Sequence, residues 1–165
     1  FFYIESPDRS CGIRVTGELA APGTVDVVGT LRTNEHGERY IESSGVSWID
    51  PGELMPVGLT TAALGGGDWN YDPATGAGQK GITGACGLNN IGVLIRTWGQ
   101  VTERGIAYFR IGSNPGVKCV VPDGVSLPAF GDHVAVTGIS SCEKVGEELR
   151  SLVLVRMQED ITVVR

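Results

Sequence analysis

The chain has 165 residues, 25 of them glycine, and its 13 basic and 19 acidic residues give a formal net charge of −6. This length allows one ordinary domain or two small ones, and the 41% hydrophobic content excludes wholesale disorder. The acidic balance argues against a domain whose main task is to grip nucleic-acid phosphates. No segment approaches the roughly 18 uninterrupted apolar residues of a membrane-spanning helix, so we expect no membrane span.

The first 50 residues predict a β module of four strands. Residues 1–15 contain two short strands joined by a polar turn with a proline, and residues 25–49 contain a Val-rich strand, a polar hairpin and a long returning strand. The chain opens on an apolar run with neither an initiator Met nor a signal peptide, which suggests a processed chain.

Residues 51–90 form a connector that is rich in glycine and proline. One short helical turn is expected within residues 59–64, and the remaining Gly, Pro and Asn residues predict turns. Trp69 and Tyr71 indicate an ordered, packed segment, because a flexible tether rarely contains large aromatic side chains.

The second half of the chain repeats the first at an offset of about 106 to 109 residues. Residues 108–121, YFRIGSNPGVKCVV, follow the pattern of residues 2–15, FYIESPDRSCGIRV. Residues 133–161 likewise follow residues 25–49 with a Val-rich strand, a glycine, a polar hairpin and a returning strand. The chain therefore contains two copies of one β module.

The second copy has one strand more than the first. Residues 91–102, IGVLIRTWGQVT, form an apolar run that becomes alternating, as expected for a long strand that bends at Gly92 and Gly99. The first copy has no counterpart of this strand.

Five antiparallel strands, the first long and bent at a glycine, match the small Greek-key barrel called the OB-fold. We therefore predict an all-β protein of two tandem OB-fold-like modules. The first module, residues 1–50, lacks its own first strand, residues 51–90 connect the two, and residues 91–165 form the second module.

The strings FYIESPDRSCGIRV and GLNNIGVLIRTWGQVT resemble stretches of tandem OB-fold modules in large secreted or cell-surface bacterial proteins. In those modules the first string usually follows a first strand, and this chain departs from that pattern. The resemblance implies an extracellular or cell-surface location and supplies no catalytic residues.

The sequence carries no pattern of a known active site. His36 lies in a predicted hairpin tip and His133 at a strand start, where solvated turn residues are common. No GxSxG, HExxH or phosphate-binding loop is present. The adjacent acidic pairs at 147–148 and 159–160 would point to opposite faces of a strand, so they do not converge. We predict a non-enzymatic protein without a cofactor.

Asp68, Asn70 and Asp72 alternate as the first ligands of a calcium loop do. However, Pro73 stands where that loop needs Gly, and Gln79 where it needs a bidentate Glu. Turn capping explains these side chains better, and we predict no metal site.

The cysteines form an even set without a CxxC pair, which argues against structural zinc. Two disulfides in a secreted protein are the favoured interpretation, with three possible pairings, and four buried thiols in a cytosolic protein are the alternative. The residues concerned are Cys11, Cys86, Cys119 and Cys142.

OB-folds often bind single-stranded nucleic acid by stacking bases on aromatic side chains along a basic groove. The corresponding candidates here are Tyr3, Arg14, Tyr108, Arg110 and Lys118. Three basic residues are few for a chain of net charge −6, so nucleic-acid binding is disfavoured, and glycan or peptide binding on this face is no better supported.

The missing strand predicts self-assembly into a homo-oligomer or homopolymer such as a filament. A neighbouring copy would supply a strand, and the β-branched tail at residues 160–165 suits donation. The expected subunit-interface residues are Phe1, Phe2, Tyr3, Ile4, Ile161, Val163 and Val164. Two alternatives stay open: closure of the first module within one chain, giving a monomer, and a binding module for single-stranded nucleic acid or glycan.

Overall fold

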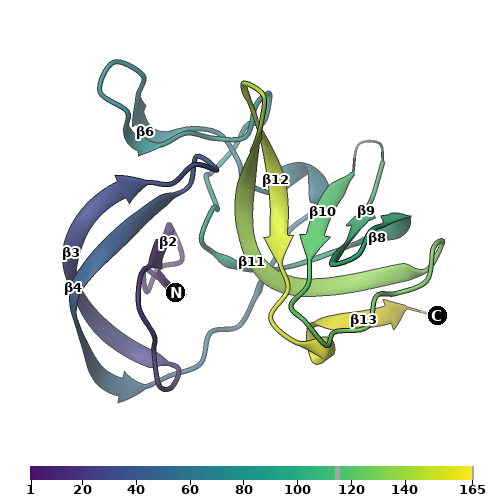
Figure 1. Ribbon diagram of the computed structural model, residues 1–165, viewed down its shortest axis with the longest axis horizontal. Helices are drawn as coiled ribbons and strands as arrows, with labels where there is room; N and C mark the ends of the chain where they lie inside the picture. The colour runs from purple at the N-terminus through teal and green to yellow at the C-terminus, as the bar shows by residue number, and fades with distance from the viewer. Residues whose placement is uncertain (114–115, 165) are drawn as a thin grey trace.

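The structure is a computed structural model that describes residues 1–113 and 116–164 (Figure 1). Its regular elements in the described part of the chain are strands and two short 3-10 turns, η1 (Thr61–Ala63) and η2 (Gln158–Asp160). This confirms the predicted all-β class. Within the described residues no helix has the length and apolar character needed to cross a membrane.

The first four strands form a separate mixed sheet on one side of the molecule (Figure 1). They are β1 (Phe2–Glu5), β2 (Gly12–Val15), β3 (Gly23–Thr33) and β4 (Arg39–Pro51). Their order is β1-β2-β4-β3, with β1 antiparallel to β2, β2 parallel to β4, and β3 antiparallel to β4. β1 and β3 are therefore the two edges of this sheet, which we call the N-terminal sheet.

The connector adds three short strands. β5 (Val57–Gly58) pairs in parallel with the start of β8, and β6 (Trp69–Asp72) forms a hairpin with β7 (Ala77–Gln79). The predicted helical turn is present as η1, and the buried Leu64 that follows it packs into the core of the second half of the chain.

The remaining strands form a barrel-like closed ring with one extra strand. They are β8 (Leu94–Arg104), β9 (Tyr108–Ile111), β10 (Val117–Val120), β11 (His133–Val145), β12 (Glu148–Leu154) and β13 (Ile161–Val164). The ring runs β8-β9-β10-β12-β11 and closes because β11 also pairs with β8. β13 lies outside the ring, antiparallel to the first residues of β11.

The two halves share one pairing pattern. β9, β10, β12 and β11 are joined by antiparallel, parallel and antiparallel pairings in the same order as β1, β2, β4 and β3. The strand that closes the ring, β8, has no counterpart in the N-terminal sheet. β8 closes the ring because its first half pairs with β11 and its second half with β9.

The hydrophobic core lies almost entirely inside the ring. It consists of residues from β8 to β12 and their flanks, together with Leu64, and its members are nearly inaccessible to solvent. In the N-terminal sheet, Val15 is the one apolar side chain among the fully buried residues that the structure describes. The ring thus has a closed core, and the N-terminal sheet does not.

Thr97 of β8 points into the ring core, and its hydroxyl is buried without a hydrogen-bond partner among the described residues. A buried hydroxyl without a partner destabilises a fold by about 1–3 kcal/mol, whereas an apolar group of the same shape does not. We expect Thr97→Val to raise the free energy of unfolding by about 1 kcal/mol in urea titration, with Thr30→Val at an exposed position of β3 as the neutral control. A loss of stability in Thr97→Val would mean that the hydroxyl is bonded.

Candidate functional site

The outer edges of β1 and β3 carry unpaired backbone groups. Ser6 donates its N–H to Cys11 O across the β1–β2 hairpin, and N–H directions alternate along a strand. Tyr3 and Glu5 therefore direct their N–H and C=O groups away from β2, toward the open side. An edge of this kind is a template for another strand.

One face of the N-terminal sheet is apolar. Directly paired residues share a face, so the strand registers place Phe2 beside Val15, Ile4 beside Ile13, and Val15 beside Ile41. The same face continues across β4 and β3 through the pairs Ile41–Leu31, Val46–Val27 and Trp48–Val25. We call these side chains the open apolar face: Phe2, Ile4, Ile13, Val15, Val25, Val27, Leu31, Ile41, Val46 and Trp48.

This face is incompletely covered. Leu31 is 57% exposed and Trp48 is 49% exposed, whereas the corresponding interior of the ring is sealed. Most of the other members are half-buried. Accessible apolar side chains that are arranged as in a core make this face a candidate binding surface.

The described connector strands do not fill the gap. β5 pairs with β8, and β6 and β7 pair with each other, so none adds to β1 or β3. Closure within one chain, which the sequence left open, does not occur among the described residues.

A buried carboxylate fixes the N-terminal sheet to the ring. Glu38, at the start of the return from the β3–β4 hairpin, is only 3% exposed. Its Oε1 accepts the hydroxyl hydrogens of Tyr3 at 2.9 Å and of Ser141 of β11 at 3.0 Å, and its Oε2 lies 3.6 Å from Nη1 of Arg14. Burial, with the neighbouring Glu38 charge, raises the pKa of Tyr3 far above its usual range. The junction joins β1, β2, the hairpin and β11.

The connector strengthens the same junction. Gln79 donates to Gly37 O at 3.0 Å and accepts the Arg39 N–H at 2.8 Å, so it holds both sides of the β3–β4 hairpin tip. Thr83 exchanges two hydrogen bonds with Leu149 of β12. The connector therefore bridges the N-terminal sheet and the ring.

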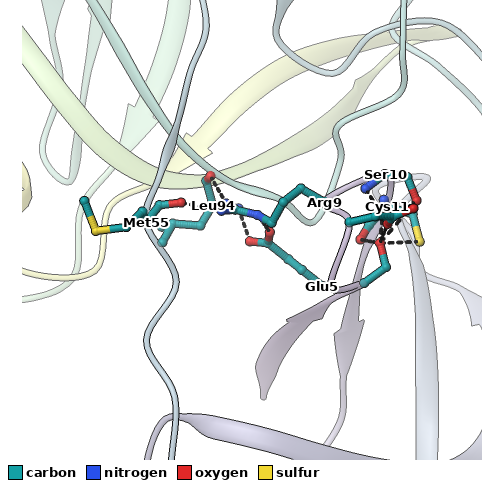
Figure 2. Close-up of polar contacts among 8 residues, drawn as sticks. Glu5, Arg9, Ser10, Cys11, Met55 and Leu94 are labelled. Atoms are coloured by element: carbon teal, nitrogen blue, oxygen red, sulfur yellow. Dashed lines mark hydrogen bonds and ion pairs between the residues drawn. The ribbon is translucent and has the colours of Figure 1, made fainter.

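A second junction lies where the turn after β1 meets β8 (Figure 2). Glu5 accepts the N–H of Leu94 and pairs with Arg9, which donates to the carbonyl oxygens of Leu94 and Met55. Arg9 adopts φ +62°, a left-handed backbone conformation that carries strain for a residue with a side chain. The Glu5 carboxylate and the Arg9 guanidinium thus bond the N–H and the C=O of Leu94, as a neighbouring strand would do at the beginning of β8.

The turn that presents Arg9 is held by its own side chains. Asp8 accepts hydrogen bonds from the hydroxyls of Ser6 and Ser10, and these bonds lower the pKa of Asp8 to about 2. Next to the turn, a Cβ on Gly12 or Gly92 would collide with the backbone of the other, so the two halves approach at a point that only glycine permits.

The residues of the predicted ligand face do not form one surface. Tyr3 and Arg14 belong to the Glu38 junction, where Arg14 also lies over the Phe1 ring at 3.7 Å. Tyr108, Arg110 and Lys118 gather on the outside of β9 and β10.

The charges of this second cluster are paired. Lys118 Nζ lies 2.6 Å from Glu143, and Arg110 Nε lies 3.2 Å from Glu103, which also accepts the Tyr108 hydroxyl hydrogen. A phosphate would have to displace these carboxylates. The sequence signals that were missed are the two acidic partners, Glu103 on β8 and Glu143 on β11.

The predicted interface residues lie in two separate places. Phe1 is exposed, and Phe2, Tyr3 and Ile4 are half-buried in the N-terminal sheet. Ile161 packs against the ring core, whereas Val163 and Val164 are exposed on β13. The tail proposed as a free donor is thus already paired with β11 of its own chain, and its outer edge is the part left available.

The prediction of two disulfides is wrong: all four cysteines are free. Cys119 is sealed in the ring core, Cys142 is buried with its thiol against His36 O at 3.5 Å, Cys11 contacts Ser6, and Cys86 is exposed in the connector. The four thiols occupy four different environments, so an even count did not reflect spatial pairing.

The candidate metal and catalytic residues have local structural roles. Asp72 accepts the N–H of Ala74 and the hydroxyl hydrogen of Thr75, as a turn cap does, whereas Asp68 accepts the N–H of Gly81, 13 residues away. The described residues contain no group of three or more His, Cys, Asp or Glu side chains that could hold a metal ion. His36 lies at the exposed hairpin tip, 3.7 Å from Glu35.

No family model matches this chain, and no curated protein matches it.

Glu38→Gln should weaken the junction, because the amide removes the charge that faces Arg14 and replaces one carboxylate oxygen with an NH2 group that cannot accept a hydrogen bond. We expect a loss of about 1–3 kcal/mol in the free energy of unfolding, measured by urea titration. Glu35→Gln, at the exposed tip of the same hairpin, is the matched control and should change little. Equal stability of the two variants would contradict the role of Glu38.

Thiol labelling should separate the four cysteines. Burial raises the pKa of Cys142 to about 12 and that of Cys119 well above its usual range, so both thiols stay protonated and shielded. We expect Cys86 to react first in the native protein and all four to react in denaturant without reductant, as measured by intact mass. Fewer than four labels in denaturant would contradict the free thiols.

Proposed function

We propose that this protein is a non-enzymatic structural or interaction protein that assembles with copies of itself, through the N-terminal sheet acting as a strand acceptor. The observation that carries the proposal is the open apolar face between two unpaired edges, β1 and β3. The occupant we infer is a strand of a second copy of this chain.

The strand order supports an interpretation of both halves as OB-type modules. A closed ring of five strands, in which the third and fifth pair in parallel, is the arrangement of a small Greek-key barrel, and β8 to β12 have it. The N-terminal sheet has counterparts of four of the five strands, joined by three of the five pairings, and lacks the strand equivalent to β8. The acceptor gap therefore corresponds to one strand of a known barrel type.

Energetic considerations favour occupation of the gap. Burying a Leu-sized side chain contributes about 1.5–3 kcal/mol, and Leu31, Trp48 and Val46 are all exposed on the open apolar face. A strand added at the β1 edge would also supply partners to the outward backbone groups of Tyr3 and Glu5.

The proposed assembly is head to tail. β3 and β4 lie on one side of the molecule, and β13 and the described C-terminal end lie on the other (Figure 1). A contact between unlike ends is heterologous, and it makes a filament unless the rotation between copies closes a ring. We propose a homopolymer of this kind.

Its extracellular location is proposed from the resemblance to secreted modules alone, because the free thiols remove the disulfide argument.

Binding of single-stranded nucleic acid is the weaker candidate. The cations that would contact phosphates, Arg14, Arg110 and Lys118, are each paired with a carboxylate. No observation favours a glycan over this assembly.

Leu31→Asp should abolish association, because it places a charge on the open apolar face. Val28→Asp is the matched control: Val28 lies on the same strand, is 68% exposed and points to the opposite face, so this variant should assemble as the wild type does. Size-exclusion chromatography with light scattering and negative-stain microscopy give the readout. A wild-type chain that stays monomeric at high concentration would overturn the proposal, and so would Leu31→Asp polymers indistinguishable from wild type.

A further inference from the structure

We infer that the strand offered to the N-terminal sheet of the next copy is β13, which pairs through its outer edge while its inner edge stays on β11. This inference rests on the proposed function and names the segment that the partner contributes. It differs from donation of a free tail, because β13 stays paired with β11 of its own chain.

The outer edge of β13 is free in the described structure. β13 stands at the end of the sheet order, and its pairings run from Ile161 with Val136 to Val164 with His133. β11 is shared on its other side with β8, so no described strand covers the outer edge of β13. The edge is therefore a short unpaired strand at the surface.

A local hydrogen bond shows which backbone groups of β13 point outward. Ile161 donates its N–H to Gln158 O, so this N–H does not point to β11. Because N–H directions alternate along a strand, Val163 presents its N–H and C=O on the same outer side. Val163 is thus the residue of β13 whose backbone is positioned to bond a further strand.

The surface around this edge is apolar. Val163 and Val164 are exposed, and Trp98 of β8, 55% exposed, shares the outer face of the sheet with Ala135 and Thr162 through direct pairing. Phe1, which precedes β1, is 63% exposed, so exposed apolar side chains lie beside both free edges.

The length and the direction of β13 also suit pairing with β1. β13 and β1 both have four residues, so their edges match without overhang. In the ring, β8 runs antiparallel to both of its neighbours, so the strand that fills the equivalent gap should run antiparallel to β1. β13 is paired with β11 of its own chain and not with β1, and in Figure 1 it lies on the side of β11 away from the N-terminal sheet.

Val163→Pro tests the inference, because proline removes the outward N–H of Val163 and leaves the inner pairing of β13 available. Val163→Thr keeps the N–H and the branched shape and is the matched control. We expect Val163→Pro to associate about tenfold or more weakly than wild type at equal concentration, and Val163→Thr to associate normally. If thermal melting shows that Val163→Pro is destabilised, the double variant Val163→Lys, Val164→Lys blocks the edge by charge instead.

A mixing experiment gives an independent readout. Leu31→Asp has a damaged acceptor and an intact β13, whereas Val163→Pro has an intact acceptor and a damaged β13. Each should be monomeric alone, and a mixture of the two should form a one-to-one dimer that light scattering detects.

The outcomes separate the two proposals. Assembly of the wild type with loss in Val163→Pro, and dimers in the mixture, would support β13 as the donor. Wild-type assembly that Leu31→Asp abolishes but Val163→Pro leaves unchanged would overturn β13 and keep the acceptor sheet. A monomeric wild type would overturn the proposed function itself.

Discussion

Closure of a sheet on itself is the constraint on which this structure depends. β8 closes the ring by pairing with β9 through one half and with β11 through the other. Closure removes the free edges of the ring and seals its interior, so Ile95, Phe109 and Val153 are fully buried. The N-terminal sheet has the same four remaining strands but no closing strand, and its apolar face stays accessible. One strand therefore separates a sealed core from an accessible apolar face.

The open sheet keeps its form because the ring holds it. Glu38 links Tyr3, Arg14 and Ser141, and the Glu5–Arg9 pair binds the backbone of Leu94. These polar contacts lie on the face opposite the open apolar face, since Tyr3 and Glu5 alternate with Phe2 and Ile4 along β1. The ring thus fixes one face of the sheet and leaves the other free for a partner. Preorganisation of this kind reduces the ordering that binding would otherwise require.

Much of the architecture can be predicted from the sequence, because alternation and turn residues are local signals. The all-β class follows from them, and the extra strand expected at residues 91–102 corresponds to β8 at Leu94–Arg104. The alternation of apolar and polar residues does not show whether an apolar face is covered, so the exposure of Leu31 and Trp48 is seen only in the structure.

The site details depend on contacts between distant residues and were not predictable. In the sequence Glu38 is one of several polar residues of a hairpin, and only the packing of the hairpin on β11 buries it beside Ser141. The disulfide prediction was wrong for the same reason, because the cysteine count carries no information on spatial distance. The tail was expected to be free, but Ile161 anchors it to the ring core.

The most direct measurement of strand addition is hydrogen exchange at the β1 edge as a function of protein concentration. Tyr3 and Glu5 point their N–H groups away from β2, so in an isolated copy they face the open side of the sheet. If a strand from a second copy pairs with β1, exchange at these two amides should slow as the concentration rises, while amides inside the ring stay unchanged. Exchange at Tyr3 and Glu5 that is independent of concentration, in samples shown to be assembled, would contradict strand addition at this edge.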